Sequence, residues 1–141
     1  MDILRLSNVL SEATEQALRD LELVRNDPDY VINFNKWHEK CEDTSQFEKR
    51  KCAVCFAGSV MVKSLGANIN TFYVPQDFPE ESSMLLALDF IRKGNILNAL
   101  LNLKMNMPKN CESTMSVDQD NYENFVRDIK LIIEYLKNFK L

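Results

Sequence analysis

The stretch KRKCAVCFAGSVMVKSLG, residues 49–66, decides the fold that the sequence predicts. From Lys51 to Leu65, small and large apolar side chains cover most of the circumference of a helix, which is typical of a helix in the middle of a bundle. Gly58 costs about 1 kcal/mol in a helix interior relative to alanine, and the close approach of a neighbouring helix would explain it. Gly66 stands where a left-handed residue usually ends a helix. We therefore expect a buried central helix from about Lys51 to Leu65.

The composition agrees with a single helical domain spanning residues 1–141. Hydrophobic residues make up 45% and charged residues 27% of the 141 residues, which are ordinary globular values and give enough apolar side chains for one core. Three glycines and four prolines are too few for the many turns of a sandwich or barrel. Helices joined by a few loops fit this scarcity better.

The segments before the central stretch predict two further helices. Residues 8–25 place apolar side chains three and four apart, which predicts an amphipathic helix that ends before Pro28. The following YVINFNKWHEKC, residues 30–41, is read as a short helix with aromatic residues on one face. Residues 42–48 are polar and predict a loop.

The segments after the central stretch alternate between loops and helices. Residues 67–80 predict an irregular connection that lies over the core, and a helix follows from Ser82 or Ser83 to a basic last turn and Gly94. Asn95 is expected to cap a further helix, ILNALLNLKM, whose stripe includes Leu100 and Leu101. Residues 105–117 are expected to form an exposed loop.

The last helix has the clearest pattern. Asp120 and Glu123 resemble a capping box at its start. Apolar residues then step by four, three, four and three through Phe125, Ile129, Ile132, Leu136 and Phe139. Such a seam packs in a bundle or against a second copy, so a homodimer through this helix is a possible assembly. The fold class predicted is all-α: a compact bundle of five or six helices with a long C-terminal helix.

Charge and composition exclude several functional classes. A net charge of −4 and a pI of about 5.1 argue against general nucleic-acid binding. No apolar run is long enough for a membrane span, and the first residues lack the plan of a signal peptide. The four cysteines are then best read as reduced thiols, so we expect a cytoplasmic protein without a membrane partner.

Four residues form a formal zinc pattern, His-x2-Cys-x10-Cys-x2-Cys. They are His38, Cys41, Cys52 and Cys55. The apolar neighbours of the last two cysteines favour thiols buried in the core, since free cysteine behaves as a small hydrophobe. We therefore expect no cofactor, with a zinc-stabilised interaction module as the alternative.

A second group of residues predicts an anion site. Lys49, Arg50 and Lys51 would precede the central helix, whose first turn offers unpaired amides to a phosphate-bearing ligand or an acidic partner. Arg92 and Lys93 could add positive charge, and Phe72 and Tyr73 could stack on a base. The plainer interpretation is that the basic residues are solvated and that the aromatic residues seal the core.

Catalysis has little support in the sequence. The sequence contains a single histidine, and it has no nucleophile elbow, phosphate loop or His-Glu-x-x-His motif. We therefore expect no enzymatic activity and no catalytic residue.

Three stretches carry a resemblance: DPDYVINFNKWHE, CAVCFAGSVMVKSLG and LLALDFIRKGNILNAL. Together they resemble a loose group of small uncharacterised proteins of tailed bacteriophages, which share a Cys-x-Val-Cys-Leu/Phe-Ala-Gly helix. The likeness covers roughly residues 20–100, and the group has no assigned chemistry to transfer. It implies an accessory protein made in the cytoplasm of an infected host cell. Such a protein would act in counter-defence, by binding and inhibiting a host protein or by sequestering a small anionic signalling nucleotide. For a host protein, the acidic outer helix faces and the seam of the last helix would be the contact surfaces.

Overall fold

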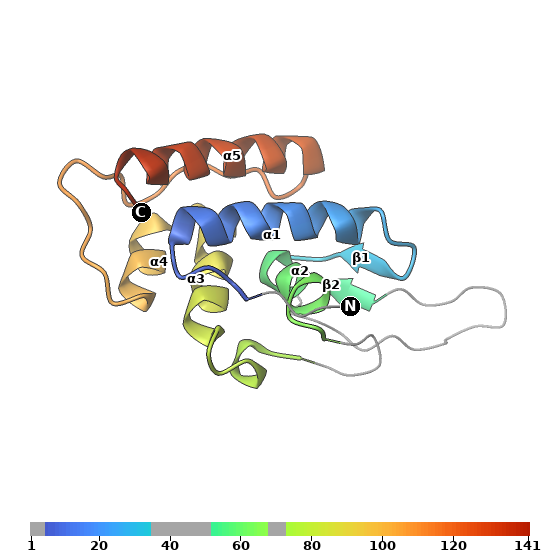
Figure 1. Cartoon of the computed structure of the whole chain (residues 1–141). Helices are drawn as coiled ribbons and strands as arrows, with labels where there is room; N and C mark the ends of the chain where they lie inside the picture. The colour runs from blue at the N-terminus through green and yellow to red at the C-terminus, as the bar shows by residue number, and fades with distance from the viewer. Residues whose placement is uncertain (1–4, 35–51, 68–72) are drawn as a thin grey trace, which may run out of the picture.

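The chain folds into a mainly helical domain with one short pair of strands (Figure 1). The computed structural model describes residues 5–34, 52–67 and 73–141. Its elements in this part of the chain are α1 (Leu10–Arg25), β1 (Tyr30–Ile32), β2 (Cys52–Val54), α2 (Phe56–Lys63), a 3-10 helix (Pro75–Asp77), α3 (Ser82–Arg92), α4 (Ile96–Asn102) and α5 (Tyr122–Asn138). The prediction of a mostly helical chain is confirmed, but a purely all-α bundle is not what forms.

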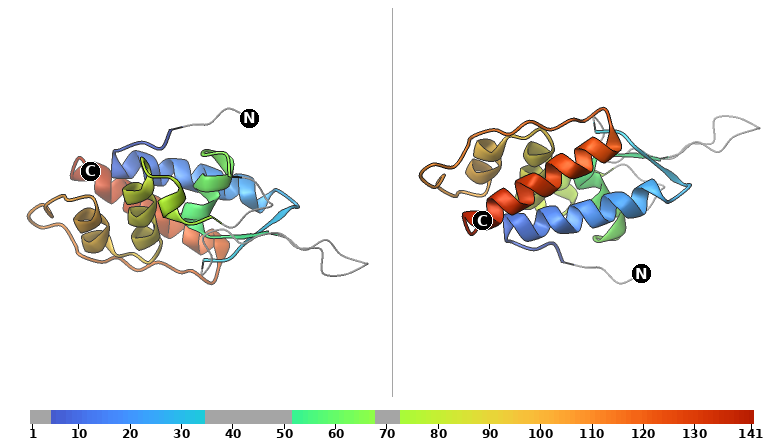
Figure 2. Two further views of the ribbon diagram at one scale, coloured as in Figure 1. Left: turned by 90° about the horizontal axis from the view of Figure 1, so that it is seen from below. Right: turned by 90° about the horizontal axis from the view of Figure 1, so that it is seen from above.

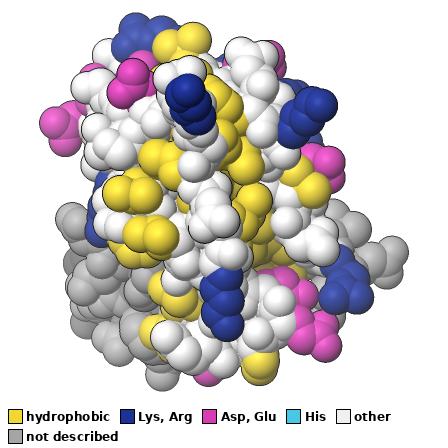
Figure 3. All heavy atoms as spheres, turned by 90° about the vertical axis from the view of Figure 1, so that its left-hand side faces the viewer, with side chains coloured by type: hydrophobic (Ala, Val, Ile, Leu, Met, Phe, Trp, Pro, Cys, Tyr) yellow, Lys and Arg dark blue, Asp and Glu magenta, His cyan; other side chains and the backbone are white. Residues whose placement is uncertain are grey.

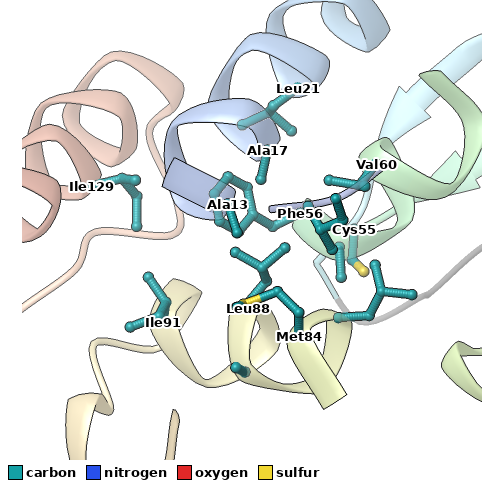
Figure 4. Packing of buried hydrophobic residues seen from close by; sticks show 14 of the residues in the cluster. Ala13, Ala17, Leu21, Cys55, Phe56, Val60, Met84, Leu88, Ile91 and Ile129 are labelled. Carbon is teal, nitrogen blue, oxygen red and sulfur yellow. The ribbon is translucent and has the colours of Figure 1, made fainter. Parts of the chain in front are cut away.

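Helix α1 lies at the centre of the domain and contacts α2, α3 and α5. Its apolar stripe is buried as the spacing predicts, and Ala13 and Ala17 let the neighbouring helices come close. Figure 4 shows Phe56 pointing into the space between α1 and α3, beside Leu88 of α3. The core is therefore built around the helix that precedes the two strands.

Helices α1 and α5 run antiparallel, side by side (Figure 2). At one end, the backbone N–H of Ser11 donates to the backbone oxygen of Leu141 over 3.1 Å. At the other end, the Arg25 guanidinium lies 3.4 Å from the Glu123 carboxylate. These two contacts join the start of each helix to the end of the other.

The apolar seam of α5 faces the inside of the chain. Phe125, Ile129, Ile132 and Leu136 are fully buried, and Phe139 packs against the same core. Packing within the chain already covers this seam, so the seam is not the surface that a second copy would contact, and a homodimer through the rest of the C-terminal helix stays a prediction. Helix α5 begins at Tyr122 and is capped by Asn121, whose side chain accepts a hydrogen bond from the N–H of Asn124 over 2.9 Å, so the predicted cap at Asp120 is one residue off.

The predicted helix from Lys51 to Leu65 is only partly right. Residues 52–54 form β2, which pairs in parallel with β1, and α2 begins at Phe56. Beyond the strand pair, the N–H of Asn33 donates to the carbonyl of Val54 over 2.7 Å. Pairing with β1 thus satisfies backbone groups that a longer helix would have satisfied internally. The short helix expected over 30–41 is likewise replaced by β1 at its start, and its remainder lies outside the described residues.

The turn from α3 to α4 forms as predicted. Gly94 has φ +76°, and its N–H donates to Ile91 while that of Asn95 donates to Phe90, which closes a Schellman motif. Asn95 then caps α4 through a 3.1 Å hydrogen bond from the N–H of Asn98. Gly66 also adopts a left-handed backbone, at φ +81°.

The segment 105–117 is exposed in part but is held against the fold. The N–H of Met115 donates to the carbonyl of Gly94 over 2.8 Å, and that of Leu97 to Ser113 over 3.0 Å. Further on, the hydroxyl of Tyr135 on α5 accepts from the N–H of Glu112 over 2.9 Å. The segment therefore bridges α4 and α5 instead of standing free.

Candidate functional site: an arginine pocket

A hollow of about 570 Å³ lies where α1 and α3 end and α5 begins. We call it the arginine pocket. Its charged and aromatic lining residues are Arg25, Arg92, Asp120, Phe34 and Tyr122. Arg25 is the last residue of α1, Arg92 is the last residue of α3, and Tyr122 is the first residue of α5. Cationic side chains at the ends of two helices are favourable there, because the free carbonyls carry partial negative charge.

Arg92 is the most deeply set charge of the pocket. It is 8% exposed, and its Nε and Nη1 donate hydrogen bonds of 2.6 Å to Asp89 and Gln119, respectively. Within the described residues, Nη2 has no hydrogen bond. A guanidinium carries five N–H donors, so most of the donor capacity of Arg92 remains for a ligand or for water.

Arg25 is placed by the contact between α1 and α5. Its guanidinium carbon lies 3.7 Å from the centre of the Tyr122 ring, and its Nη2 lies 3.4 Å from Glu123. The cation–π contact holds the guanidinium against the ring, while the long and exposed ion pair adds little. Burial beside this contact raises the pKa of Tyr122, so the phenol stays neutral.

Phe34 connects the pocket to the core. Its ring centre lies 4.6 Å from that of Phe125, which in turn contacts Phe56 edge-on at 5.5 Å. Phe34 is only partly buried, so it contributes an apolar wall to the pocket. The pocket thus combines two guanidinium groups with two aromatic rings, and Asp120 is the one acidic residue among its described lining.

The predicted anion site is only partly assembled. Arg92 lines the arginine pocket, whereas its neighbour Lys93 is exposed and lies 3.6 Å from Asp89. Tyr73 lies with its ring 5.7 Å from Phe78 and packs against the core, so it seals the core instead of lining this pocket. The other four residues of the prediction, Lys49, Arg50, Lys51 and Phe72, lie outside the described residues.

The start of α2 does not offer the anion site that was expected there. The helix begins at Phe56, after β2, and its first residues are buried. The N–H of Gly58 donates to the Cys55 sulfur over 3.2 Å, so this helix is capped from within the chain. In the sequence, Lys49, Arg50 and Lys51 therefore precede a strand and not a helix, which removes the helix-start argument for an anion site at these residues.

The described residues do not show the four residues of the zinc pattern in a ligand arrangement. His38 and Cys41 lie outside them, as does the side chain of Cys52. Cys55 is 1% exposed, and burial raises its pKa to about 12, which favours the protonated thiol. Among the side chains that are described, no three His, Cys, Asp or Glu residues are grouped to hold a metal ion.

Arg25, Phe34 and Tyr122 were missed by sequence reasoning. Arg25 ends α1, Tyr122 begins α5, and Phe34 follows β1 by two residues. The only local signal among them is that Arg25 is a basic residue in the last turn of the first helix. No local pattern relates Arg25 to Tyr122, because the antiparallel packing of α1 on α5 alone brings them together. Only the tertiary structure therefore shows that these residues share a site.

A larger groove of about 750 Å³ lies between α1 and α5. Acidic and basic side chains alternate along it, and Lys137 pairs there with Glu15. Its lining holds four glutamates and three basic residues, so its charge does not favour an anion. The arginine pocket is the better candidate for a specific ligand.

In the described part of the chain, no helix has the length and apolar character needed to cross a bilayer. No protein-family model, no curated protein and no solved structure is significantly similar to this chain.

Proposed function

We propose that the protein is a non-catalytic binding protein that sequesters a small anionic molecule, such as a signalling nucleotide, in the arginine pocket. The observation that carries this proposal is the burial of Arg92 beside the pocket, with some of its N–H donors left for a ligand. Its guanidinium is almost buried, lines the pocket and keeps donors without a hydrogen bond among the described residues. Without a ligand these donors face the water of the pocket, and an anion would replace that water with charge-assisted hydrogen bonds, which are about twice as strong as neutral ones.

Asp89 and Gln119 support the role of Arg92 in this proposal. Both accept from the guanidinium at 2.6 Å and hold it in one orientation. Planar guanidinium groups bind carboxylates and phosphates with two parallel hydrogen bonds, so a fixed Arg92 is prepared for such a ligand. Arg25 stands on the same hollow and can add a second positive charge.

The size and walls of the pocket fit a nucleotide-sized ligand. Its volume of about 570 Å³ falls in the range of about 300–1,000 Å³ that ligand pockets usually have. Phe34 and Tyr122 offer apolar and aromatic surface for a ring, next to the charges that would hold a phosphate. A ligand that carries both a ring and a phosphate would therefore use more of the pocket than inorganic phosphate alone.

Thermal melting in the presence of single ligands tests the proposal. Inorganic phosphate, nucleoside monophosphates and cyclic nucleotides would each be titrated onto the full chain. A ligand of the folded state raises the melting temperature, and at 100 times its Kd it adds about 2.7 kcal/mol of stability. We expect at least one phosphate-bearing ligand to do so, and the matching nucleoside without phosphate to do so less.

Matched variants locate the binding site. Arg92→Lys keeps a cation beside Asp89 but removes the two-pronged donor, so we expect it to lose most of the ligand-induced shift. Arg25→Gln should weaken the shift as well. Lys93→Gln is the control, because Lys93 is exposed on the same turn and does not line the pocket. Equal shifts in all three variants, or no shift with any ligand, would contradict the proposal.

The resemblance to proteins of tailed bacteriophages supplies a setting for this activity. In that setting the chain would act in the cytoplasm of the host cell and remove a nucleotide that signals infection. The proposal on the pocket does not depend on the setting, because the ligand titrations test the binding directly.

A further inference from the structure

We propose that the arginine pocket selects guanine nucleotides, because Gln119 and Asp120 match the hydrogen-bonding edge of this base. This selection rests on the proposed function, to which it adds the identity of the base. Both residues line the pocket, and they are neighbours in the chain just before α5. Gln119 supplies an amide donor there, and Asp120 supplies a carboxylate acceptor.

The orientation of the Gln119 side chain follows from its contact with Arg92. Nη1 of Arg92 donates to Oε1 of Gln119 over 2.6 Å. Since a guanidinium only donates, the glutamine must turn its oxygen toward Arg92 and its NH2 group away from it. This NH2 group makes no hydrogen bond to a described residue. Gln119 therefore keeps N–H donors for a ligand in the pocket.

The Asp120 carboxylate is exposed, and it has neither an ion pair nor a hydrogen bond within the described part of the chain. It is not the counter-ion of either arginine of the pocket. Arg92 lies 2.6 Å from Asp89, and Arg25 lies 3.4 Å from Glu123. An ionised carboxylate accepts through two oxygens, so both oxygens of Asp120 remain for a ligand or for water.

The turn that carries this donor and acceptor is held by Asp118. Its carboxylate accepts from the N–H of Asp120 over 2.9 Å, from the N–H of Asn121 over 3.3 Å and from Nδ2 of Asn124 over 3.0 Å. The N–H of Asp118 donates to the Asp128 carboxylate over 2.9 Å. The hydrogen bonds from Asn124 and from the backbone of Asp120 lower the pKa of Asp118, so it stays ionised at neutral pH. The backbone of Asp120 is thus fixed against the first turns of α5.

Guanine is the base whose edge matches Gln119 and Asp120. It presents the O6 acceptor, which can accept from Gln119, followed by the N1–H and N2–H donors, which can meet the two oxygens of Asp120. Adenine and cytosine place an unprotonated ring nitrogen beside their amino group, so a carboxylate would face a lone pair. Uracil has one N–H between two carbonyls. A two-pronged contact between a side chain and a base discriminates by roughly 5- to 150-fold, and water around the exposed Asp120 favours the lower part of this range.

The face shown in Figure 3 is built differently. Lysine and arginine side chains are spread there among hydrophobic and uncharged ones, instead of being gathered at one place. A single charge can attract an anion, but it does not distinguish one base from another. In the arginine pocket, donors and an acceptor line one hollow together with the rings of Phe34 and Tyr122. The pocket therefore combines a phosphate site with groups that can recognise the base.

Isothermal titration calorimetry of the full chain with three 5′-monophosphates tests this selection. GMP, IMP and AMP share the ribose and the phosphate, and IMP differs from GMP only by lacking the N2 amino group. We expect GMP to bind about tenfold more tightly than AMP, with IMP between the two because it keeps O6 and N1–H.

Asp120→Asn is the decisive variant. Its amide has one donor and one acceptor, so the affinity ratio of GMP to AMP should fall to within about twofold. XMP carries a carbonyl in place of the N2 amino group, and it should bind at least about fivefold more tightly to this variant than to the unchanged chain. Such a gain cannot be due to unfolding. Glu112→Gln removes an exposed carboxylate outside the pocket lining, so this control should keep the ratio of GMP to AMP.

The guanine selection and the proposed function fail in different ways. Equal affinities for GMP, IMP and AMP that all fall in Arg92→Lys would support the anion site and overturn the guanine selection. An unchanged ratio of GMP to AMP in Asp120→Asn would also overturn it. Absence of GMP binding overturns the guanine selection in every case, whereas the proposed function is wrong only if the other phosphate-bearing ligands fail to bind as well.

Discussion

Ser64, which caps the end of α2, donates a hydrogen bond of 2.5 Å to the carboxylate of Asp20 on α1. Both side chains are buried, and Gln16 donates to the same serine hydroxyl over 3.1 Å. Burial raises the pKa of Asp20 to about 6, although the hydrogen bond from Ser64 and the nearby Arg19 and Lys63 act in the opposite direction. Above this pH the folded chain therefore holds a carboxylate charge that would be more stable in water.

The first prediction is that Asp20 makes the fold less stable as the pH rises. The folded-state pKa of about 6 lies above the ordinary value of 3.8, so the folded state keeps its proton between these two values while the unfolded state loses it. The contribution of Asp20 to the free energy of unfolding is thus greatest below pH 3.8 and falls by roughly 2–3 kcal/mol by the time the pH exceeds 6.

Replacing Asp20 by asparagine isolates this effect. The asparagine side chain can still accept from Ser64 but carries no charge, so Asp20→Asn should raise the free energy of unfolding at pH 7 and change it little at pH 4. Urea unfolding at both values measures the difference. Glu80→Gln, at an exposed carboxylate, is the control. A gain from Asp20→Asn that is the same at both pH values would contradict the assigned cause.

Gly94 gives the second prediction. A Cβ at this position would lie 1.7 Å from the carbonyl oxygen of Met115, and the backbone φ of +76° disfavours any side chain. Gly94→Ala must therefore displace the 113–117 segment, which is held by hydrogen bonds at Gly94 and Leu97. We expect a loss of more than about 2 kcal/mol in stability, measured by urea unfolding.

Two further measurements identify the reason for that loss. Hydrogen exchange at the amides of Met115 and Leu97 should accelerate in Gly94→Ala, since both amides donate across this junction. Lys93→Ala, one residue earlier and exposed, should leave both the exchange and the stability nearly unchanged. If hydrogen exchange at Met115 were unaltered in Gly94→Ala, the backbone of Met115 would not lie as close to Gly94 as the structure shows, and the prediction would be wrong.

Cys55 gives the third prediction, on thiol reactivity. The thiol is 1% exposed, and burial raises its pKa to about 12, whereas Cys111 is half-buried near the surface. Since the thiolate is the reactive form, iodoacetamide at pH 8 should modify Cys55 at least about a hundredfold more slowly in the folded than in the urea-unfolded chain. Site-resolved mass spectrometry measures both sites, and Cys111 should react first. Rapid labelling of Cys55 would mean that the core around α2 opens readily.

The parts of the fold that follow from local pattern were predictable. The α5 seam and the Gly94 turn depend on residues within one or two helical turns, and both form as expected. The strand β2 was not predictable, because Cys52–Val54 has the apolar character of the helix that follows it. Its strand conformation depends on pairing with Tyr30–Ile32 from a distant part of the chain.

The same distinction applies to the candidate site. Arg92 could be predicted, since a basic last turn before glycine is a local signal. Its hydrogen bond to Gln119 could not, because Gln119 comes from the distant segment before α5. Tyr122 and Arg25 meet only through the packing of two helices at opposite ends of the sequence. Tertiary contacts, and not residue types, therefore determine which of the many charged side chains share one pocket.

The last prediction concerns what holds α5 to α1. Ile129 is fully buried in the seam, whereas the Lys137–Glu15 ion pair lies at the surface, with side-chain exposures of 46% and 35%. Removing apolar volume from a packed core costs about 2–5 kcal/mol for isoleucine to alanine, while an exposed ion pair contributes about 1 kcal/mol or less. Ile129→Ala should therefore lower the free energy of unfolding severalfold more than Glu15→Gln. Raised salt should reduce only the effect of Glu15→Gln, because ions screen the surface pair and leave apolar packing intact. If Glu15→Gln lowered the free energy of unfolding as much as Ile129→Ala, this would contradict the prediction. The contact between α1 and α5 would then depend mainly on surface charge and not on apolar packing.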